Sequence, residues 1–586
     1  MKAIETIKRL SHYLKPYRIG FFLVLFFTLT TVACGTMLPY AMGLPTTEIA
    51  KNVMHHEAIN FAYIGKTLIL VIAAGLGYGA SQLLSGVLIT NVVQSAMKDL
   101  RQEIDRKINR LPVSYFDTHQ QGNVLSRVTN DVDVVSGALQ QAFIGIINAV
   151  LGILLSVAMM FYINVYMALV ALVMIPASFL ISRYIVKKSQ TYFNQMQNAL
   201  GEMNGYVQEN MTGFNVIKAF GHEKQALEGF YQVNHQLKRY GFRAAFVSGL
   251  MMPLVQLTAY LTYIVIAVMG SFYVIGGVLL VGQLQAFIQY IWQVSQPMGN
   301  ITQLSAVLQS ASAASKRIFE LLDEADEPVN EQDVALPTDV RGDVVFENVS
   351  FGYTPDKLLI KNLNVSVKAG QTVAIVGPTG AGKTTLINLL MRFYDVTSGA
   401  IKIDGIDTKT MARSEVRSLF GMVLQDAWLY EGSIADNIRF GKLDATEYEV
   451  VDAAKTANVD HFIRTMPKGY DMVINAEGEN VSLGQKQLMT IARAVIANPK
   501  ILILDEATSS VDTRLEALIQ KAMKQVMEGR TSFVIAHRLS TIREADLILV
   551  MDQGSIIEQG NHETLLAQNG FYAKLYNSQF SETEVS

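Results

Sequence analysis

The first half of the chain consists of long apolar stretches separated by polar segments, some short and some long. Each stretch exceeds the roughly 20 residues that a helix needs to cross a bilayer. The first stretch is too long for a signal peptide, and no small-residue cleavage site follows it. We therefore expect six membrane-spanning helices, at 18–43, 63–93, 138–162, 166–187, 246–274 and 283–305.

Helical periodicity continues beyond two of these stretches. After the second stretch, apolar positions recur at helical spacing from Val93 to Leu111, with charged residues between them. After the fourth, a similar pattern runs from Phe193 to Val207. A continuous helix over 63–111 would be roughly 70 Å long, against an apolar bilayer core of about 30 Å. We expect such helices to project into the cytosol; the alternative is an amphipathic helix on the membrane surface.

Positive charge predicts the orientation of the spans. Basic residues are concentrated at the N-terminus and in the long segments after the second and fourth spans, whereas the short turns after the third and fifth carry none. By the positive-inside rule, the N-terminus, both long segments and the C-terminal half are cytosolic. The basic positions are Lys2, Lys8, Arg9, Lys15, Arg18, Lys98, Arg101, Arg106, Lys107, Arg110, Lys187, Lys188, Lys218, Lys224, Lys238 and Arg239.

A glycine-rich segment, GPTGAGKTT, stands between a predicted strand at 372–376 and a predicted helix. Its glycines allow backbone N–H groups to wrap phosphates, and the helix N-terminus adds its positive dipole. Lys383 would reach the terminal phosphates of ATP, and the Thr384 hydroxyl would reach Mg²⁺. The alternative is a chance glycine-rich turn. The predicted phosphate-binding residues are Gly377, Thr379, Gly380, Ala381, Gly382, Lys383, Thr384 and Thr385.

Two carboxylates close a second apolar strand, ILILD, at 501–505. Asp505 would face Mg²⁺, and Glu506 would position the attacking water. The alternative is that this pair only caps the next helix. A third apolar strand, FVIAH, ends in His537, which could contact the γ-phosphate, although a lone histidine after a strand is more often structural.

The two halves predict two kinds of domain. The chain has 586 residues, which is too long for one domain, and 50% of them are hydrophobic. The predicted fold class is an α-helical six-span transmembrane domain plus an α/β P-loop nucleotide-binding domain. The predicted parts are 1–322, an acidic linker at 323–342, and 343–586. A net charge of −3 gives no sign of nucleic-acid binding, and a single cysteine, Cys34, excludes an intrachain disulfide.

The motifs over residues 343–577 resemble the nucleotide-binding domain of ATP-binding-cassette (ABC) transporters, and SIADNIRFG at 433–441 resembles their exporter branch. The resemblance implies that Tyr353 stacks on adenine and that Gln425 links Mg²⁺ to the membrane domain. In this family two such domains sandwich two ATP molecules head to tail. The resemblance also assigns the signature to Ser482, Gly484 and Gln485, the loop after the catalytic strand to Asp512, and the switch histidine to His537.

The signature segment departs from the family pattern. Ser482 and Gln485 form a capping box, and such a helix start leaves N–H groups free for an anion. The usual LSGGQ reads VSLGQ, so Leu483 replaces a glycine whose bare backbone approaches the γ-phosphate. The arginine that exporters commonly carry just upstream is also missing from Asn475–Gly478. We therefore expect a heterodimer with a second half-transporter that has an intact signature and, on the family pattern, a degenerate catalytic strand (Walker B). A homodimer that tolerates Leu483 is the alternative.

An ATPase joined to membrane helices indicates ATP-driven export across a bacterial cell membrane, with ATP and Mg²⁺ as cofactors. Methionine and aromatic surfaces adapt to varied apolar ligands, although helix packing also explains them. The lead hypothesis is multidrug efflux of amphipathic drug-like compounds. Membrane lipid is also expected as a partner, because the spans lie in the bilayer. The alternatives are a homodimeric lipid or lipid-linked flippase and an ATP-gated channel or regulatory subunit. The candidate substrate-facing residues are Met251, Met252, Met269, Phe287, Tyr290 and Trp292.

Overall fold

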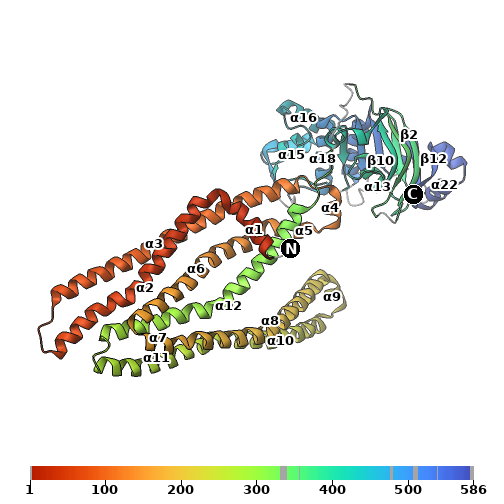
Figure 1. Ribbon diagram of the computed structural model, residues 1–586. Coiled ribbons are helices and arrows are strands. Elements are labelled where there is room, and N and C mark those ends of the chain that lie inside the picture. Colours follow the sequence, from red (N-terminus) through yellow and green to blue (C-terminus); the bar gives the residue numbers. More distant parts are fainter. Residues whose placement is uncertain are drawn as a thin grey trace. The chain divides into compact units, whose positions relative to one another are not determined.

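The computed structural model of the chain describes residues 3–329, 339–354, 357–425, 427–475, 480–505, 513–536 and 539–580. The chain divides into two compact units (Figure 1). The first unit comprises Met1–Leu111 and His119–Ala325, and the second comprises Pro112–Thr118 and Asp326–Ser586. The short segment Pro112–Thr118 therefore belongs to the second unit, although helices of the first unit flank it in the sequence.

The first unit is built from helices, several of them very long (Figure 1). The helices are α1 (Ala3–Leu14), α2 (Arg18–Met54), α3 (Phe61–Ile108), α5 (Gln121–Ser126), α6 (Val132–Ile163), α7 (Val165–Leu172), α8 (Met174–Thr212), α9 (Phe214–Phe220), α10 (Glu223–Gly249), α11 (Met251–Ile275) and α12 (Val281–Asp323). A short π-helix, Arg127–Asp131, joins α5 to α6.

The predicted helical extensions are confirmed as parts of continuous helices. α3 runs without a break over 48 residues, and α8 is continuous over 39. In the second half of α3, Val93, Met97, Leu100 and Ile104 are almost fully buried. The apolar stripe of this helix therefore packs inside the unit and does not lie on a membrane surface.

Five helical segments of the described chain are long and apolar enough to cross a membrane: Lys8–Met54, Phe61–Ile108, Gln121–Ile163, Val165–Thr212 and Glu223–Ile275. α12, which contains the sixth predicted span, is not among them. The reason is a run of polar residues that lowers its mean hydropathy, namely Gln283, Gln285, Gln289, Gln293 and Gln296. The six-span count therefore stays a prediction.

Two polar side chains of α12, those of Tyr290 and Gln293, are used in packing against α2. Phe287 and Tyr290 are fully buried, and the Tyr290 hydroxyl donates to the carbonyl oxygen of Thr36 in α2 at 2.8 Å. The Gln293 amide donates to the carbonyl oxygen of Gly35 at 3.0 Å. Both bonds satisfy helix carbonyls inside an apolar layer, where unpaired polar groups are costly. Helix packing therefore accounts for Phe287 and Tyr290, two of the candidate substrate-facing residues.

α2 and α12 touch backbone to backbone at a pair of glycines. A Cβ placed on Gly282 would lie 1.7 Å from the carbonyl oxygen of Gly43, and one placed on Gly43 would lie 2.3 Å from that of Gly282. The Gly282 N–H also donates to the Thr47 hydroxyl at 3.1 Å. Only glycine permits this approach, because any side chain would separate the two helices.

The second unit is an α/β structure, as predicted. Its main sheet has six strands in the order β12-β11-β3-β10-β9-β6, parallel except for β12, and a four-stranded antiparallel sheet has the order β2-β1-β4-β5. The strands are β1 (Val344–Phe351), β2 (Ile360–Val367), β3 (Thr372–Val376), β4 (Ser398–Ile403), β5 (Ile406–Asp407), β6 (Phe420–Val423), β7 (Gly432–Ser433), β8 (Val473–Ile474), β9 (Ile501–Asp505), β10 (Thr531–Ile535), β11 (Leu547–Asp552) and β12 (Ser555–Gly560).

Helices connect and cover these strands (Figure 1). They are α13 (Lys383–Leu390), α14 (Arg413–Ser418), α15 (Ile434–Arg439), α16 (Glu447–Thr456), α17 (Asp460–Thr465), α18 (Leu483–Ala497), α19 (Thr513–Met527), α20 (Leu539–Glu544), α21 (His562–Ala567) and α22 (Phe571–Phe580). β3, β9 and β10 are central and almost wholly buried. Because they run parallel, their carboxyl ends lie at one edge of the sheet, where ligands of such folds bind.

A short helix from the first half of the chain, α4 (Val113–Thr118), packs in the second unit. Tyr115 is buried, and the Asp117 carboxylate accepts a hydrogen bond from the Tyr394 hydroxyl. Residues 113–118, which follow the long helix α3, thus form a helix that contacts the nucleotide-binding part. Residues 214–220, in the long segment after the fourth predicted span, form α9 within the first unit.

The described part of the predicted linker is attached to the second unit by charged contacts. The Glu327 carboxylate pairs with the Arg417 guanidinium at 2.5 Å, and the Pro328 carbonyl oxygen accepts from Arg413 at 3.3 Å. Residues 330–338 lie outside the described residues. The chain therefore meets the second unit within a few residues of the end of α12.

Candidate nucleotide-binding site

The glycine-rich segment forms a loop between β3 and α13, as the motif predicts. Gly377 and Gly382 have φ values of 154° and 101°, which side-chain-bearing residues rarely adopt. A Cβ on Gly377 would lie 2.2 Å from the carbonyl oxygen of Met551, whereas one on Gly380 would meet open space. The loop is therefore closely packed on its inner side and open on the side that faces a phosphate.

Lys383 begins α13 and lies over this loop. Its Nζ donates to the carbonyl oxygens of Gly377 and Pro378 at 2.7 and 3.1 Å. Burial lowers the pKa of Lys383, and the charge of Asp505 opposes that shift. A lysine held by neutral carbonyls can exchange them for phosphate oxygens, so the loop and its lysine fit a nucleoside triphosphate.

Three candidate Mg²⁺ ligands come from separate elements of the unit. Thr384 is exposed in the first turn of α13, Asp505 is half-buried at the end of β9, and Gln425 is exposed just after β6. β6 and β9 are parallel neighbours, with Val423 opposite Leu504. A hydroxyl, a carboxylate and an amide oxygen suit Mg²⁺, which binds through few protein ligands together with substrate phosphates.

Three predicted residues, Glu506, Asp512 and His537, lie outside the described residues. Their proposed roles in the site remain predictions.

Tyr353 follows β1 and has a side chain that is 50% exposed. Its hydroxyl lies 3.1 Å from the Thr385 hydroxyl in α13. Its ring meets the rings of Phe351 and Tyr394 edge-on, with centroids 5.0 Å away in each case. The Tyr353 ring is therefore held by two neighbouring rings and has enough exposure to stack on a base.

The signature segment has the predicted capping box. The Ser482 N–H donates to the Gln485 side chain at 2.7 Å, and the Gln485 N–H donates to the Ser482 hydroxyl at 3.4 Å. α18 starts at Leu483, whose side chain is 48% exposed, and Gly484 is buried. The branched side chain of Leu483 thus stands at the exposed beginning of the helix, where an approaching anion would meet it.

Sequence reasoning missed the aromatic and acidic residues that support Tyr353. Tyr394 packs against Tyr353, and its hydroxyl donates to Asp117, which is 277 positions away. The available signal was modest: an aromatic pair, Phe393 and Tyr394, directly follows the predicted helix after the glycine loop.

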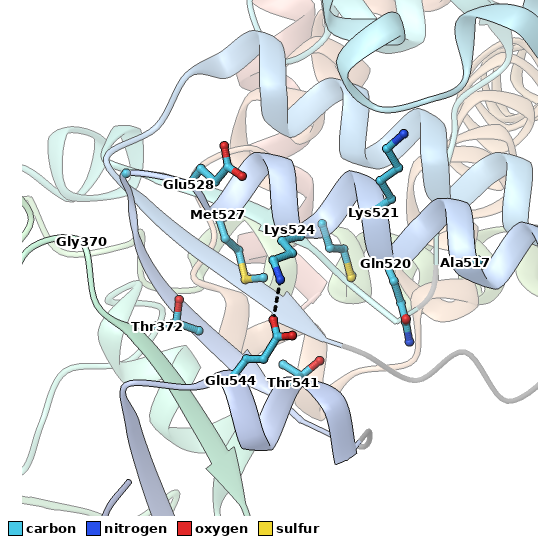
Figure 2. A pocket seen from close by; sticks show the side chains of 12 residues that line it. Gly370, Thr372, Ala517, Gln520, Lys521, Lys524, Met527, Glu528, Thr541 and Glu544 are labelled. Atoms are coloured by element: carbon cyan, nitrogen blue, oxygen red, sulfur yellow. Dashed lines mark hydrogen bonds and ion pairs between the residues drawn. The ribbon is translucent and has the colours of Figure 1, made fainter. Parts of the chain in front are cut away.

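A second hollow of about 590 Å³ lies beside α19 and α20 (Figure 2). Thr372, the first residue of β3, lines this hollow. The hollow is therefore at the beginning of β3, whereas the glycine loop follows the end of that strand. Lys524 and Glu544 form an ion pair across it at 2.8 Å. This hollow is therefore separate from the phosphate site.

The chain matches two family models. Residues 21–298 match the ABC transporter transmembrane region, and residues 360–509 match the ABC transporter model. A helical unit rich in apolar spans and a P-loop α/β unit define an ATP-hydrolysing membrane transporter. The chain belongs to the ABC transporter family.

Its relatives include proteins named for different transport activities. The chain is 45% identical to a fatty acid ABC transporter ATP-binding/permease protein of Mycobacterium bovis, over 89% of this chain and 83% of that protein. It is 38% identical to the uncharacterized ABC transporter ATP-binding protein YfiC of Bacillus subtilis, over 98% of this chain and 94% of that protein. It is 31% identical to an ATP-dependent lipid A-core flippase of Syntrophus aciditrophicus, over 100% of this chain and 96% of that protein.

Family membership establishes the general activity. The protein is a multi-pass membrane protein that couples ATP hydrolysis, with Mg²⁺, to transport. The chain matches one transmembrane region and one ABC region, the arrangement of a half-transporter, and half-transporters of this family work as dimers, with themselves or with a second subunit.

Proposed function

We propose that the glycine loop and the carboxyl ends of β9 and β10 form the ATPase site of this subunit. When bound, ATP would supply the phosphoryl group that is transferred to water, and Mg²⁺ would offset the negative charge of the phosphates. Lys383 would bind the terminal phosphate oxygens, and Thr384, Gln425 and Asp505 would hold the metal. Glu506 would orient the attacking water and accept its proton. The observation that carries this assignment is the loop geometry, with Lys383 held over it by two carbonyls.

His537 and Tyr353 have supporting roles in this proposal. His537 would donate to the γ-phosphate and report its presence to the rest of the domain. Tyr353 would stack on the adenine with its exposed ring face. Ser482, Gly484 and Gln485 would present the start of α18 to ATP bound by the other subunit, and Asp512 would belong to the loop after the catalytic strand. We also propose that the chain is divided into a transmembrane domain at 1–322, a linker at 323–342 and a nucleotide-binding domain at 343–586.

For the substrate, we propose amphipathic molecules with a lipid-like apolar part and an anionic head group, exported from the inner leaflet. A groove of about 450 Å³ lies between α8 and the α10–α11 bend, and its lining is mostly apolar. Lys188 stands at this groove, with its Nζ 5.9 Å from the centroid of the Tyr184 ring. The relative named a fatty acid transporter supports this class of substrate. The groove is lined by Leu180, Ile181, Tyr184, Ile185, Lys188, Phe246, Val247, Leu250 and Leu254.

Multidrug efflux of amphipathic drug-like compounds is the second candidate. Met252 and Tyr260 are well exposed on α11, and Trp292 packs edge-on against Tyr260 with centroids 5.0 Å apart. Such polarisable and aromatic side chains accommodate varied apolar shapes. This surface would favour neutral or cationic amphiphiles, because it offers no lysine of its own.

The two candidates separate in one reconstitution experiment. We would measure ATP hydrolysis in liposomes with oleate and, separately, with a cationic amphipathic dye. Lipid-like export predicts stimulation by oleate that Lys188→Gln removes, while Lys187→Gln, an exposed neighbour outside the groove, retains it. Stimulation by the dye alone favours multidrug efflux. Hydrolysis that neither compound changes would favour the channel or regulatory reading.

We also propose that the chain works as one half of a heterodimer. Leu483 is the first residue of α18, and its exposed branched side chain replaces the glycine that usually faces ATP of the other subunit. The complete ATP site would then join this chain's Lys383, Asp505, Glu506 and His537 to the partner's intact signature.

The heterodimer proposal predicts an asymmetric effect of one substitution. Glu506→Gln in this chain alone should abolish nearly all steady-state ATP hydrolysis, because the other ATP site is already weak. The measurement is ATPase activity in lipid with a candidate partner subunit. If about half of the activity survives, both sites are competent and the homodimer that tolerates Leu483 is favoured.

A further inference from the structure

Tyr394 occupies the space between the α4 segment and the proposed adenine platform. It follows α13 by a few residues, after a turn in which Arg392 has a φ of 52°. Its ring is half-buried, and its hydroxyl reaches out of the aromatic cluster towards α4. One side chain thus touches both the nucleotide-binding region and a segment that comes from the membrane half of the sequence.

On the inner side, Tyr394 completes a cluster of three aromatic rings. Its centroid lies 5.0 Å from that of Tyr353 at an interplanar angle of 89°, and 5.6 Å from that of Phe351. Phe351 is buried in the core of the antiparallel sheet, so it fixes the base of the cluster. Edge-to-face contacts of this kind are directional, and the orientation of the Tyr394 ring therefore constrains that of Tyr353.

On the outer side, Tyr394 is bound to α4 through a charged acceptor. Its hydroxyl donates to the Asp117 carboxylate. Burial raises the pKa of Tyr394, and the hydrogen bond to Asp117 raises it further, so the hydroxyl remains a donor at any physiological pH. Hydrogen bonds to ionised groups are stronger than neutral ones, which makes this contact effective for holding α4.

We propose that Tyr394 is a positioning residue that links α4 to the adenine-stacking ring of Tyr353. The inference rests on the proposed role of Tyr353 and goes beyond it. When Asp117 holds Tyr394, the Tyr353 ring is presented for stacking. When α4 moves away, Tyr394 turns and the platform loosens. Because coupling between two sites is reciprocal, nucleotide bound at Tyr353 would strengthen the contact of α4 to the same extent.

The size of the effect follows from the contact that is lost. One hydrogen bond contributes about 1 kcal/mol, which corresponds to about fivefold in an equilibrium constant. Tyr394→Phe removes the donor to Asp117 but keeps the ring. We therefore expect about a fivefold higher KM for ATP, with kcat within about twofold of the wild type. A merely structural lesion would instead lower the amount of active protein and so reduce the apparent kcat.

The experiment measures KM and kcat for ATP with the full-length protein in lipid, with its partner subunit if one is required. Asp117→Ala should reproduce Tyr394→Phe, and the double variant should add nothing, because both changes remove one contact. Asp117→Asn keeps an acceptor oxygen but loses the charge, so its KM should lie between those of the wild type and Asp117→Ala. Tyr470→Phe is the matched control, since the Tyr470 hydroxyl donates to Asp460 at 2.6 Å in the same unit, away from this cluster.

Tyr353→Ala, measured in parallel, separates this inference from the proposal beneath it. If Tyr353→Ala leaves the KM unchanged, Tyr353 does not bind the base and the assignment of the platform is wrong. If Tyr353→Ala raises the KM but Tyr394→Phe does not, the link alone is overturned. Additive effects of Tyr394→Phe and Asp117→Ala would overturn it as well, because the two residues would then act independently.

Discussion

Backbone conformation at single residues decides whether the phosphate loop can form. Gly377 combines a φ of 154° with a carbonyl oxygen 2.2 Å from where its Cβ would be. Any side chain there must move the Met551 backbone in β11, which neighbours β3 in the sheet. The loop that holds Lys383 is thus fixed by the strand beside it as well as by its own glycines.

Gly377→Ala should therefore damage ATP binding more than it damages the fold. We expect the KM for ATP to rise about tenfold or more, since strain of about 1–3 kcal/mol falls on the loop itself. Gly529→Ala is the control, because Gly529 also has a positive φ of 74° but its Cβ would meet open space. ATPase kinetics and thermal melting of both variants check this. An unchanged KM in Gly377→Ala would contradict the loop geometry.

At the scale of single residues, the sequence predicts those features whose residues are close together in the chain. The glycine loop lies within nine consecutive residues and the capping box within four, so the local spacing of residue types is enough to predict each of them. The contact between Asp117 and Tyr394 joins residues 277 positions apart, and it depends on how α4 packs against the second unit. Composition and periodicity say nothing about such a pairing.

At the scale of elements, the turn after α13 is a junction of charged groups. The carbonyl oxygen of Arg392 accepts from Arg413 at 2.8 Å and from Arg417 at 3.2 Å. Arg417 also pairs with Glu327 of the linker, and Asp395 pairs with both Arg392 and Arg413. The end of the P-loop helix and the beginning of the linker are therefore held by the same arginines.

This junction should respond to acid. Burial acts to raise the pKa of Asp395, but the hydrogen bond from Arg392 and the charge of Arg413 outweigh it and hold the pKa below its ordinary value. The ionised carboxylate therefore stabilises the fold above the ordinary Asp pKa of about 3.9, and this stabilisation is lost as the pH falls through the lower folded-state pKa. Asp395→Asn should melt below the wild type at pH 7, and the gap should close below about pH 4.

Melting temperatures of the two proteins between pH 3 and 7 provide the measurement. Asp444→Asn, at an exposed site in the same unit, serves as the control. A gap between Asp395→Asn and the wild type that persists unchanged at pH 3 would contradict the role of the ionised carboxylate.

Element boundaries were predictable where a single pattern ran long enough. The stripe from Val93 onwards predicted one continuous helix, and α3 is continuous. α12 was harder, because Gln293 satisfies a helix carbonyl on α2 while it and the other glutamines lower the hydropathy of α12. A pattern based on apolar residues alone cannot separate a polar residue that packs from one that meets water.

At the scale of the whole molecule, the orientation of the helices can be tested with cysteine labelling. The chain has one natural cysteine, Cys34, so Cys34→Ser gives a cysteine-free background. The positive-inside rule predicts that Glu57→Cys, between α2 and α3, is outside, and that Lys98→Cys, on α3, is inside. A membrane-impermeant maleimide should label the first in intact cells and the second only after permeabilisation. The reverse labelling would contradict the predicted orientation.

The glycine contact between α2 and α12 limits how the membrane half can move. With Gly43 and Gly282 in backbone contact, and Thr47 hydrogen-bonded across the seam, neither helix can slide or roll past the other there without first separating. The first and last long helices of this unit are therefore tied to each other at that seam. Any motion that opens a path for substrate must carry both helices along at this point or break the contact.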